Sequence, residues 1–212
     1  MKIAINKAHY PVTVLGHGRR IAIWVQGCSI GCKDCVSQDT WAHDAEKEIE
    51  VDELLGWCRQ VGAQGVDGIT ISGGEPFEQP EALSYLLSEL RDWADGLPDI
   101  VDFLCYSGMP YRRIREKFPQ VLAYLDAIIP EPFVSTLPSD SLRGSSNQSI
   151  VVLTALGRDR YGAQIQPAKR FQTAVDQDCI WFIGIPERGD MDRVASYCKD
   201  RGVTLNGVSW RA

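Results

Sequence analysis

The sequence predicts an α/β fold with about five to six mainly parallel strands and a small C-terminal extension. Short apolar runs typical of strands alternate along the chain with amphipathic segments typical of helices. That alternation favours strand–helix–strand units with right-handed crossovers, and hence a parallel sheet. A length of 212 residues suits one domain with an appendage. We therefore expect a core over 1–155 and an extension over 156–212 that packs on the core.

Five buried strands are expected, each from a run of apolar residues rich in β-branched side chains. The most distinct run reads RIAIWVQG and leads directly into a group of cysteines. Another ends in the glycines of ISGGEP. The strands are expected within 20–27, 66–76, 100–108, 121–130 and 149–155.

Helices are expected where apolar residues recur every three or four positions. In the clearest of them Pro80 stands near the first turn, and four leucines share one side. The helices are expected over 50–63, 79–94, 111–118 and 189–202. The polar stretch 156–170 is expected to be a loop, and the runs KRFQTAV and CIWFIGIP to form a hairpin.

Charge, apolar content and cysteine content indicate which binding partners and which cellular compartment to expect. The formal net charge is −6 and the pI about 5.1, so we expect no general attraction to nucleic acid or to anionic membranes. No N-terminal signal peptide is evident, and no stretch approaches the roughly 20 apolar residues of a membrane span. The seven cysteines are odd in number and unevenly spread, which is unlike a disulfide-built secreted domain. We expect a cytoplasmic protein.

Three of those cysteines fall within eight positions: Cys28, Cys32 and Cys35 in the stretch GCSIGCKDC. A structural zinc site normally has four ligands, so zinc would need a fourth from His43 or a distant cysteine. A redox pair would use Cys32 and Cys35 and leave Cys28 without a role. Three unrelated buried cysteines are a further alternative.

A 4Fe-4S cluster explains three thiols best. Such a cluster usually has four thiolate ligands, so three of them leave one iron without a protein ligand. That iron can bind a small molecule through an amine and a carboxylate, such as the methionine end of S-adenosylmethionine. Catalysis would then be carried by the cofactor, and the protein would position it.

The C-x3-C-x2-C loop after a strand resembles the loop of the radical S-adenosylmethionine superfamily. A second match is ISGGEP at the end of a later strand, where the resemblance implies contact with the methionine amino group through Gly73, Gly74 and Glu75. Glycines allow the backbone to approach a ligand closely, and carbonyl oxygens accept from an ammonium group. Without that context the two glycines would indicate only a turn, and Glu75 a solvated or helix-capping acid.

Within the superfamily the chain resembles the activating proteins of glycyl radical enzymes. The segments GHGRR, CVSQDTW, CYSGMPYRRI and LRGSSNQSI follow in the order and spacing of the activating protein of anaerobic ribonucleotide reductase, over about 10–155. Three departures stand out: Asp34 and Val36, on either side of Cys35, replace residues that are often aromatic, and PEPF at 130–133 lacks the usual aspartate and glycine.

The resemblance implies the rest of the cofactor site. It includes Asp34, Cys35 and Val36 around the last cluster ligand, and Ser72 and Ser107 at strand ends, where ligands of such sheets gather. Tyr106 is expected beside the adenosine, or else as a buried packing residue. Asn147 is expected to bond the ribose, or else to cap a loop.

The implied activity is reductive cleavage of S-adenosylmethionine to a 5′-deoxyadenosyl radical, which removes hydrogen from a glycine of a partner glycyl radical enzyme. An open, partial β/α barrel would let the partner reach the cluster, and the chain is short of the about 250 residues of a complete barrel. A flavodoxin-like or ferredoxin-like protein is the implied electron donor. A stand-alone tailoring enzyme for a peptide or small metabolite is one alternative, and a non-catalytic iron–sulfur or zinc module is another.

Overall fold

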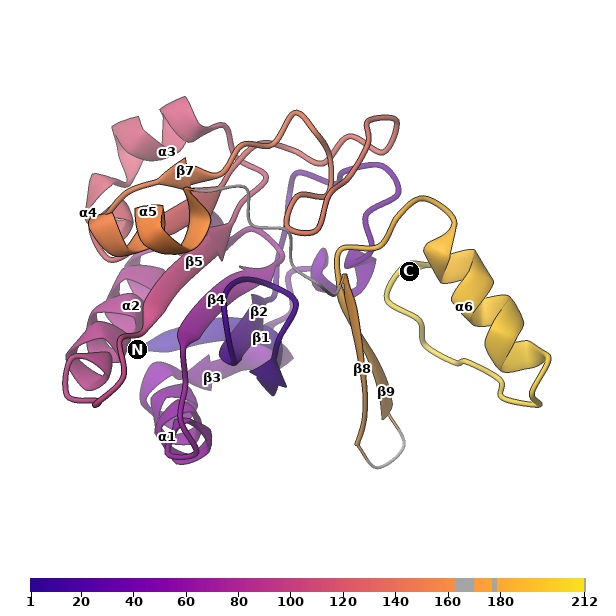
Figure 1. The fold of residues 1–212 in the computed structure, drawn as a ribbon, viewed down its shortest axis with the longest axis horizontal. Helices are drawn as coiled ribbons and strands as arrows, with labels where there is room; N and C mark the ends of the chain where they lie inside the picture. Colours follow the sequence, from indigo (N-terminus) through magenta and orange to yellow (C-terminus); the bar gives the residue numbers. More distant parts are fainter. Residues whose placement is uncertain (163–169, 177–178, 212) are drawn as a thin grey trace.

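The protein is built on one large sheet, shown in Figure 1, with strand order β3-β1-β2-β4-β5-β6-β7. The computed structural model describes residues 1–162, 170–176 and 179–211. The strands are β1 Lys2–Val12, β2 Arg20–Val25, β3 Glu48–Glu50, β4 Gly68–Gly73, β5 Asp102–Tyr106, β6 Ala127–Ile129 and β7 Val151–Val152.

The four central strands, β2, β4, β5 and β6, run parallel, as the alternating pattern predicts. Antiparallel strands flank them: β1 and β3 on one side, β7 on the other. All five expected strands are present, whereas β1 and β3 were not expected. The apolar alternation of β1 is interrupted, and its pairing with β2 contains two register shifts, so its sequence carries a weak strand signal. The partial barrel stays a prediction.

The expected helices are present, with two additions. The helices are α1 Val51–Gly62, α2 Pro80–Ala94, α3 Tyr111–Lys117, α4 Pro119–Leu122, α5 Ala155–Tyr161 and α6 Asp190–Lys199. Short 3-10 turns are η1 Gln38–Thr40, η2 Ala45–Lys47 and η3 Pro76–Glu78. The expectation of a loop from residue 156 is wrong as far as Tyr161. The Thr154 hydroxyl caps α5 by accepting from the Gly157 amide at 3.1 Å, and Tyr161 is buried. Residues 163–169 of that expected loop lie outside the described part of the chain.

Strand β2 divides the apolar packing of the molecule between the two faces of the sheet. Ile21, Ile23 and Val25 belong to the larger core, which α1 and α2 complete with their leucines. Ala22 and Trp24 point to the other face and belong to a second cluster. Successive side chains of a strand alternate between faces, so one fully buried strand supplies both clusters.

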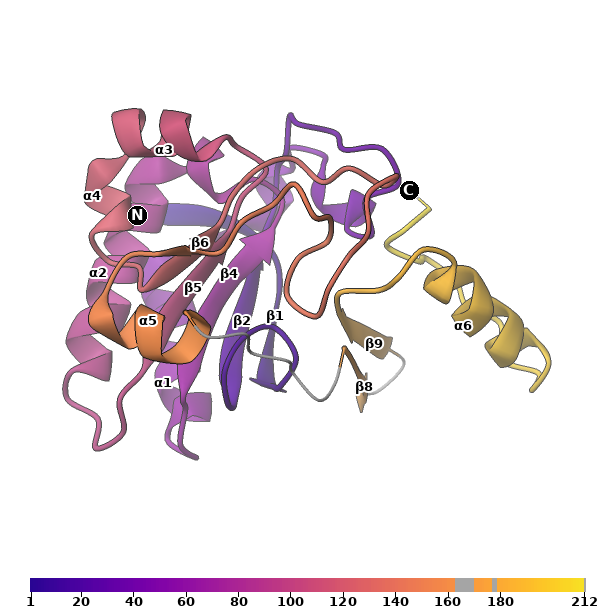
Figure 2. The same ribbon diagram turned by 45° about the horizontal axis from the view of Figure 1, so that its top comes forward.

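The C-terminal segment covers the part of the second face around Trp24, whereas Leu142 and Tyr161 cover the part formed by β5 and β6. Strands β8 Phe171–Asp176 and β9 Cys179–Gly184 form the expected antiparallel hairpin, and Ile183 packs against the cluster around Trp24. After α6 the chain returns to the cysteine loop, as Figure 2 shows: the Gln38 amide donates to the Ser209 carbonyl at 2.8 Å. The division of the chain at residue 155 stays a prediction.

Across the described ranges 1–162, 170–176 and 179–211, no helix has the length and apolar character needed to cross a membrane.

Candidate cofactor site

The candidate site lies where the parallel strands end. Strands β2, β4 and β5 run side by side in one direction, so their carboxyl ends meet at one edge of the sheet, beside the cysteine loop (Figure 2). A cavity is present at this edge. Its lining residues are Cys28, Ile30, Cys32, Cys35, Val36, Ser37, Trp41, Ser72, Gly73, Gly74, Glu75, Tyr106, Ser107, Gly108, Phe133, Gly144, Gln148, Ile185 and Pro186.

The cysteine loop is held in shape by its own backbone. The Cys28 amide donates to the Trp41 carbonyl at 3.0 Å, which closes the loop at its base. The Cys35 amide donates to the Cys32 carbonyl at 3.2 Å, and the Ser37 amide lies 3.4 Å from the Cys35 sulfur. An N–H group directed at sulfur stabilises a thiolate, the form that binds metal. All three thiols are half-buried and line the cavity.

The thiols suit a cluster of several metal atoms better than a single ion. Within the described residues, no three His, Cys, Asp or Glu side chains are gathered as ligands of one ion. In a 4Fe-4S cluster each thiolate binds a different iron, so its ligands need only surround one cavity. His43, the alternative zinc ligand, does not line the cavity, and its Nε2 faces the Glu78 carboxylate at 3.6 Å. Burial raises the pKa of the Cys28 and Cys35 thiols.

The glycine motif joins the end of β4 to the end of β2. The Gly74 amide donates to the Val25 carbonyl at 2.9 Å, and the Glu75 amide donates to the Gly27 carbonyl at 2.8 Å. Gly73 has φ +101°, and a Cβ there would lie 2.6 Å from the Val25 nitrogen. A Cβ at Gly74 would lie 2.2 Å from the Gly27 oxygen. Larger residues would force the strand ends apart, so both glycines are required by the backbone itself.

The buried Glu75 carboxylate links this motif to the end of β5. Its Oε1 accepts from the Ser107 hydroxyl at 2.8 Å and from the Phe77 amide at 3.1 Å, and its Oε2 accepts from the Gly108 amide at 2.8 Å. Burial raises the pKa of Glu75, and these three hydrogen bonds oppose that rise. Glu75 therefore fixes the position of the loop after β5, and a carboxylate still has acceptor capacity for a ligand.

Ser72, Tyr106 and Val36 line the cavity, as the prediction for the cofactor site requires. The Tyr106 hydroxyl is buried and has no hydrogen-bond partner among the described residues. Burial raises the pKa of Tyr106, so its hydroxyl stays protonated and can donate as well as accept.

Asp34 and Asn147 are not among the lining residues. Asp34 has φ +62°, so it forms the left-handed turn before Cys35. The Asn147 side chain donates to the Pro132 carbonyl at 2.9 Å and holds a loop. The adjacent Gln148 lines the cavity instead. Direct contact of Asp34 and Asn147 with a cofactor stays a prediction that this geometry does not support.

Several lining residues were not expected from the sequence. Gln148 and Gly144 lie in LRGSSNQSI and Phe133 in PEPF, so these motifs pointed to the right segments without identifying the residues. Ile185 and Pro186 come from the end of the hairpin, far away in the sequence. No local pattern distinguishes such residues, because only the return of the chain brings them to the cavity.

Comparison with known proteins gives the site a context. Residues 14–151 match the model of a family described as "4Fe-4S single cluster domain". The anaerobic ribonucleoside-triphosphate reductase-activating protein of Vibrio cholerae is 29% identical over 149 residues, which are 67% of this chain and 94% of that protein. The corresponding protein of Haemophilus influenzae is 28% identical over 148 residues, with the same two shares.

Two further proteins are similar over shorter portions. A pyruvate formate-lyase-activating enzyme of Staphylococcus aureus is 30% identical over 122 residues, which are 55% of this chain and 47% of that enzyme. The crystal structure of QueE from Escherichia coli superimposes with a TM-score of 0.43 at 20% identity, over 61% of this chain and 70% of that one.

Proposed function

Because the chain belongs to the 4Fe-4S single cluster domain family and is an enzyme of the radical S-adenosylmethionine activating type, we propose that it activates a glycyl radical enzyme. Its cofactors are a 4Fe-4S cluster and S-adenosylmethionine. The observation that carries the proposal is the convergence of the three thiols and the Gly73–Glu75 motif on one cavity. The substrate would be one glycine of the partner, and anaerobic ribonucleotide reductase is the first partner to test.

The residues around the cavity divide the work of binding. When bound, the cluster and S-adenosylmethionine supply a carbon radical able to remove hydrogen from an unactivated C–H bond. Cys28, Cys32 and Cys35 would hold the cluster as thiolates. Gly73 and Gly74 would bring backbone close to the ligand, and Glu75 holds the loop after β5 in position.

The proposal includes the finer points of the architecture. The open sheet would be a partial barrel whose uncovered side admits the partner's glycine, and residues 156–212 would be an extension of the 1–155 core. The electron would come from a flavodoxin-like or ferredoxin-like protein. Ser72, Val36 and Tyr106 would contact S-adenosylmethionine, because they line the cavity beside the cysteine loop.

The proposal is tested by mixing the anaerobically reconstituted protein with a chemical reductant, S-adenosylmethionine and the anaerobic ribonucleotide reductase of the same organism. We expect an electron paramagnetic resonance signal of a glycyl radical on the reductase, and none when Cys32→Ser replaces the wild-type protein. Rapid formation of 5′-deoxyadenosine with no radical on the reductase would contradict this function.

One observation favours a second candidate, a tailoring enzyme acting on a peptide or small metabolite. The match to the Vibrio cholerae protein covers 67% of this chain, while residues of the C-terminal part, Cys179 to Pro186 and Val203 to Trp210 among them, line a second cavity next to the first. A cavity of this kind suits a small substrate that enters without a partner protein. Turnover of a small substrate with release of 5′-deoxyadenosine, in the absence of any partner protein, would favour this candidate.

A further inference from the structure

A second cavity of about 650 Å³ adjoins the cofactor cavity, on the face of the sheet that the hairpin covers. Its volume lies within the range of about 300–1,000 Å³ that is usual for ligand sites. Six residues line both cavities, so the two cavities lie directly side by side. The shared residues are Val36, Ser37, Ser72, Tyr106, Ile185 and Pro186.

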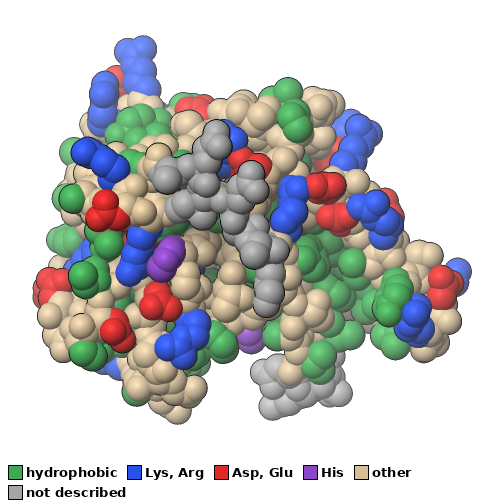
Figure 3. Space-filling model, in the orientation of Figure 1, with side chains coloured by type: hydrophobic (Ala, Val, Ile, Leu, Met, Phe, Trp, Pro, Cys, Tyr) green, Lys and Arg blue, Asp and Glu red, His purple; other side chains and the backbone are tan. Residues whose placement is uncertain are grey.

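This second cavity runs along strand β9. Every residue from Cys179 to Pro186 lines it, whereas Phe171 is the one lining residue of β8. The cavity therefore lies on the side of β9 that faces away from β8, and the end of β9 leads into the cofactor cavity. Figure 3 shows hydrophobic side chains gathered on the surface where the hairpin lies between the core and α6.

That side of β9 presents backbone groups without partners. The Ile185 amide donates to the Arg170 carbonyl at 3.2 Å, which makes these two residues a hydrogen-bonded pair of the antiparallel ladder. In an antiparallel ladder, hydrogen-bonded pairs alternate with non-hydrogen-bonded pairs. Ile180 and Phe182 belong to non-hydrogen-bonded pairs, so their N–H and C=O groups point away from β8. No backbone hydrogen bond to either residue comes from any other described segment. A free strand edge of this kind is a template for an added strand.

Four buried polar atoms in the lining also lack hydrogen-bond partners among the residues of known placement. They are Asp39 Oδ1, Tyr106 Oη, Trp181 Nε1 and Trp210 Nε1. Buried polar groups are almost always satisfied, so each of these atoms needs a partner that the described residues do not supply. Two indole donors, a carboxylate acceptor and a hydroxyl match the mixed C=O and N–H groups of a polypeptide backbone.

We propose that this cavity binds an extended segment of the substrate polypeptide as an added strand on β9, and that the segment continues past Ile185 and Pro186 to the cofactor cavity. The inference rests on the proposed function, since it takes the substrate to be a polypeptide glycine. Main-chain hydrogen bonds to Ile180 and Phe182 supply affinity in this mode of recognition. Every residue of β9 lines the cavity, so the cavity extends along the whole free edge of that strand. This shape favours an extended peptide over a compact metabolite.

The experiment uses the reconstituted holoenzyme with S-adenosylmethionine, without reductant, and a synthetic peptide of about ten residues around the reactive glycine of the reductase. Residue-resolved hydrogen exchange should show new protection of the Ile180 and Phe182 amides on peptide binding. Phe182→Pro removes one outward donor and should weaken peptide binding by about tenfold. Thr173→Pro is the matched control, because Thr173 faces Phe182 in the ladder and its amide points to the opposite edge of the hairpin.

The results separate this proposal from the proposed function. The added strand is supported if both amides become protected and if Phe182→Pro, but not Thr173→Pro, binds the peptide more weakly. This conclusion holds whether or not the reductase acquires a radical. A radical on the reductase with no protection of these amides in the wild-type protein overturns the added strand and leaves the activation intact. Absence of peptide binding also overturns it. If Phe182→Pro loses the cluster, the exchange data on the wild-type protein decide the question.

Discussion

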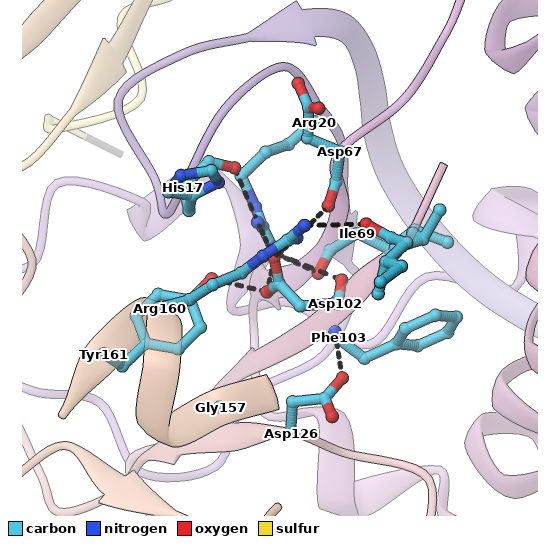
Figure 4. Close-up of polar contacts among 12 residues, drawn as sticks. His17, Arg20, Asp67, Ile69, Asp102, Phe103, Asp126, Gly157, Arg160 and Tyr161 are labelled. Atoms are coloured by element: carbon cyan, nitrogen blue, oxygen red, sulfur yellow. Dashed lines mark hydrogen bonds and ion pairs between the residues drawn. The ribbon is translucent and has the colours of Figure 1, made fainter. Parts of the chain in front are cut away.

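Arg20 and Asp102 form a fully buried, two-pronged ion pair that joins the beginnings of β2 and β5. Arg20 Nη1 lies 2.8 Å from Asp102 Oδ1, and Nη2 lies 2.9 Å from Oδ2, with both side chains 0% exposed. Figure 4 shows Arg160 and Tyr161 of α5 directed at the same carboxylate, the tyrosine hydroxyl at 2.5 Å. The pair lies at the end of the sheet opposite the cofactor cavity, so it stabilises the fold and does not take part in the chemistry.

Replacing Asp102 should destabilise the protein strongly. Asp102→Asn leaves the Arg20 guanidinium buried without its counter-ion, which costs about 3–5 kcal/mol in the free energy of unfolding. The control is Glu116→Gln, which breaks the exposed Arg112–Glu116 pair and should change stability by at most about 0.5 kcal/mol. Urea unfolding of the three proteins in the same cofactor state measures both values. If Asp102→Asn and Glu116→Gln had equal free energies of unfolding, burial of the Arg20–Asp102 pair would not be the cause of its large contribution.

The same pair predicts how stability depends on pH. Burial by itself would raise the pKa of Asp102, but the charge and hydrogen bonds of Arg20, with those of Tyr161 and Arg160, hold that pKa below its ordinary value. A depressed folded-state pKa adds stability above the unfolded-state value of about 3.9, and that stability is lost as the pH falls further. The stability difference between wild type and Asp102→Asn should be constant near neutrality and shrink below about pH 4. A difference that persists unchanged to pH 3 would argue against this origin.

The three cysteines of the loop should be individually required for the cluster. Serine at Cys28, Cys32 or Cys35 removes a thiolate ligand, so iron and sulfide content should fall close to zero after reconstitution. Cys198→Ser changes a half-buried cysteine of α6 that does not line the cofactor cavity, and it should retain wild-type iron. Iron and acid-labile sulfide assays with visible absorption measure the outcome. Full iron content in Cys32→Ser would show that Cys32 is not a ligand of the cluster.

Gly74→Ala should disrupt the cofactor site through the backbone. Its Cβ would lie 2.2 Å from the Gly27 carbonyl oxygen, so the contact between the ends of β4 and β2 must open. We expect binding of S-adenosylmethionine to the reconstituted protein to weaken by at least about tenfold, as the loss of one or more hydrogen bonds implies. Gly56→Ala in α1 is the control, because a Cβ there would meet no described atom within 4 Å beyond its chain neighbours and its own helix backbone, and alanine favours a helix by up to about 1 kcal/mol. Isothermal titration should show unchanged affinity for that variant.

Cys58 should be unreactive in the folded protein. Burial against the core raises the pKa of its thiol to about 12, so almost no thiolate exists at neutral pH. Exposed Cys179 should be alkylated by iodoacetamide in native protein, and Cys58 only after denaturation. Peptide mass spectrometry of labelled samples distinguishes the two sites. Modification of Cys58 at a rate close to that of Cys179 would contradict its burial.

Local sequence predicts much of the fold because its strongest signals are local. From Ile21 to Val25 the run is apolar without a break, so it fits a strand buried on both faces, as β2 is. Pro80 and the spaced leucines predict α2 almost to its ends. Strand β1 was missed because its interrupted alternation acquires meaning only when β2 and β3 pair with it.

Helix α5 shows that polar composition alone does not distinguish a loop from a helix. Its sequence is polar and suggests a loop, yet Arg160 and Tyr161 reach Asp102 on the core and hold the helix in place. In the same way, the sequence marks Arg20 as part of a motif near the cysteines, but its partner lies 82 residues away. Long-range pairs of this kind cannot be read from spacing along the chain.

By itself the sequence determined the order of the four central strands, the helices α1, α2, α3 and α6, the three-thiol loop and the glycine motif, because each depends on residues close together in the chain. Only the tertiary structure decided that Gln148, and not Asn147, lines the cofactor cavity, and that Ile185 and Pro186 complete it. The physical reason is that a cavity is enclosed by segments distant in sequence, and their relative positions follow from packing of the whole chain.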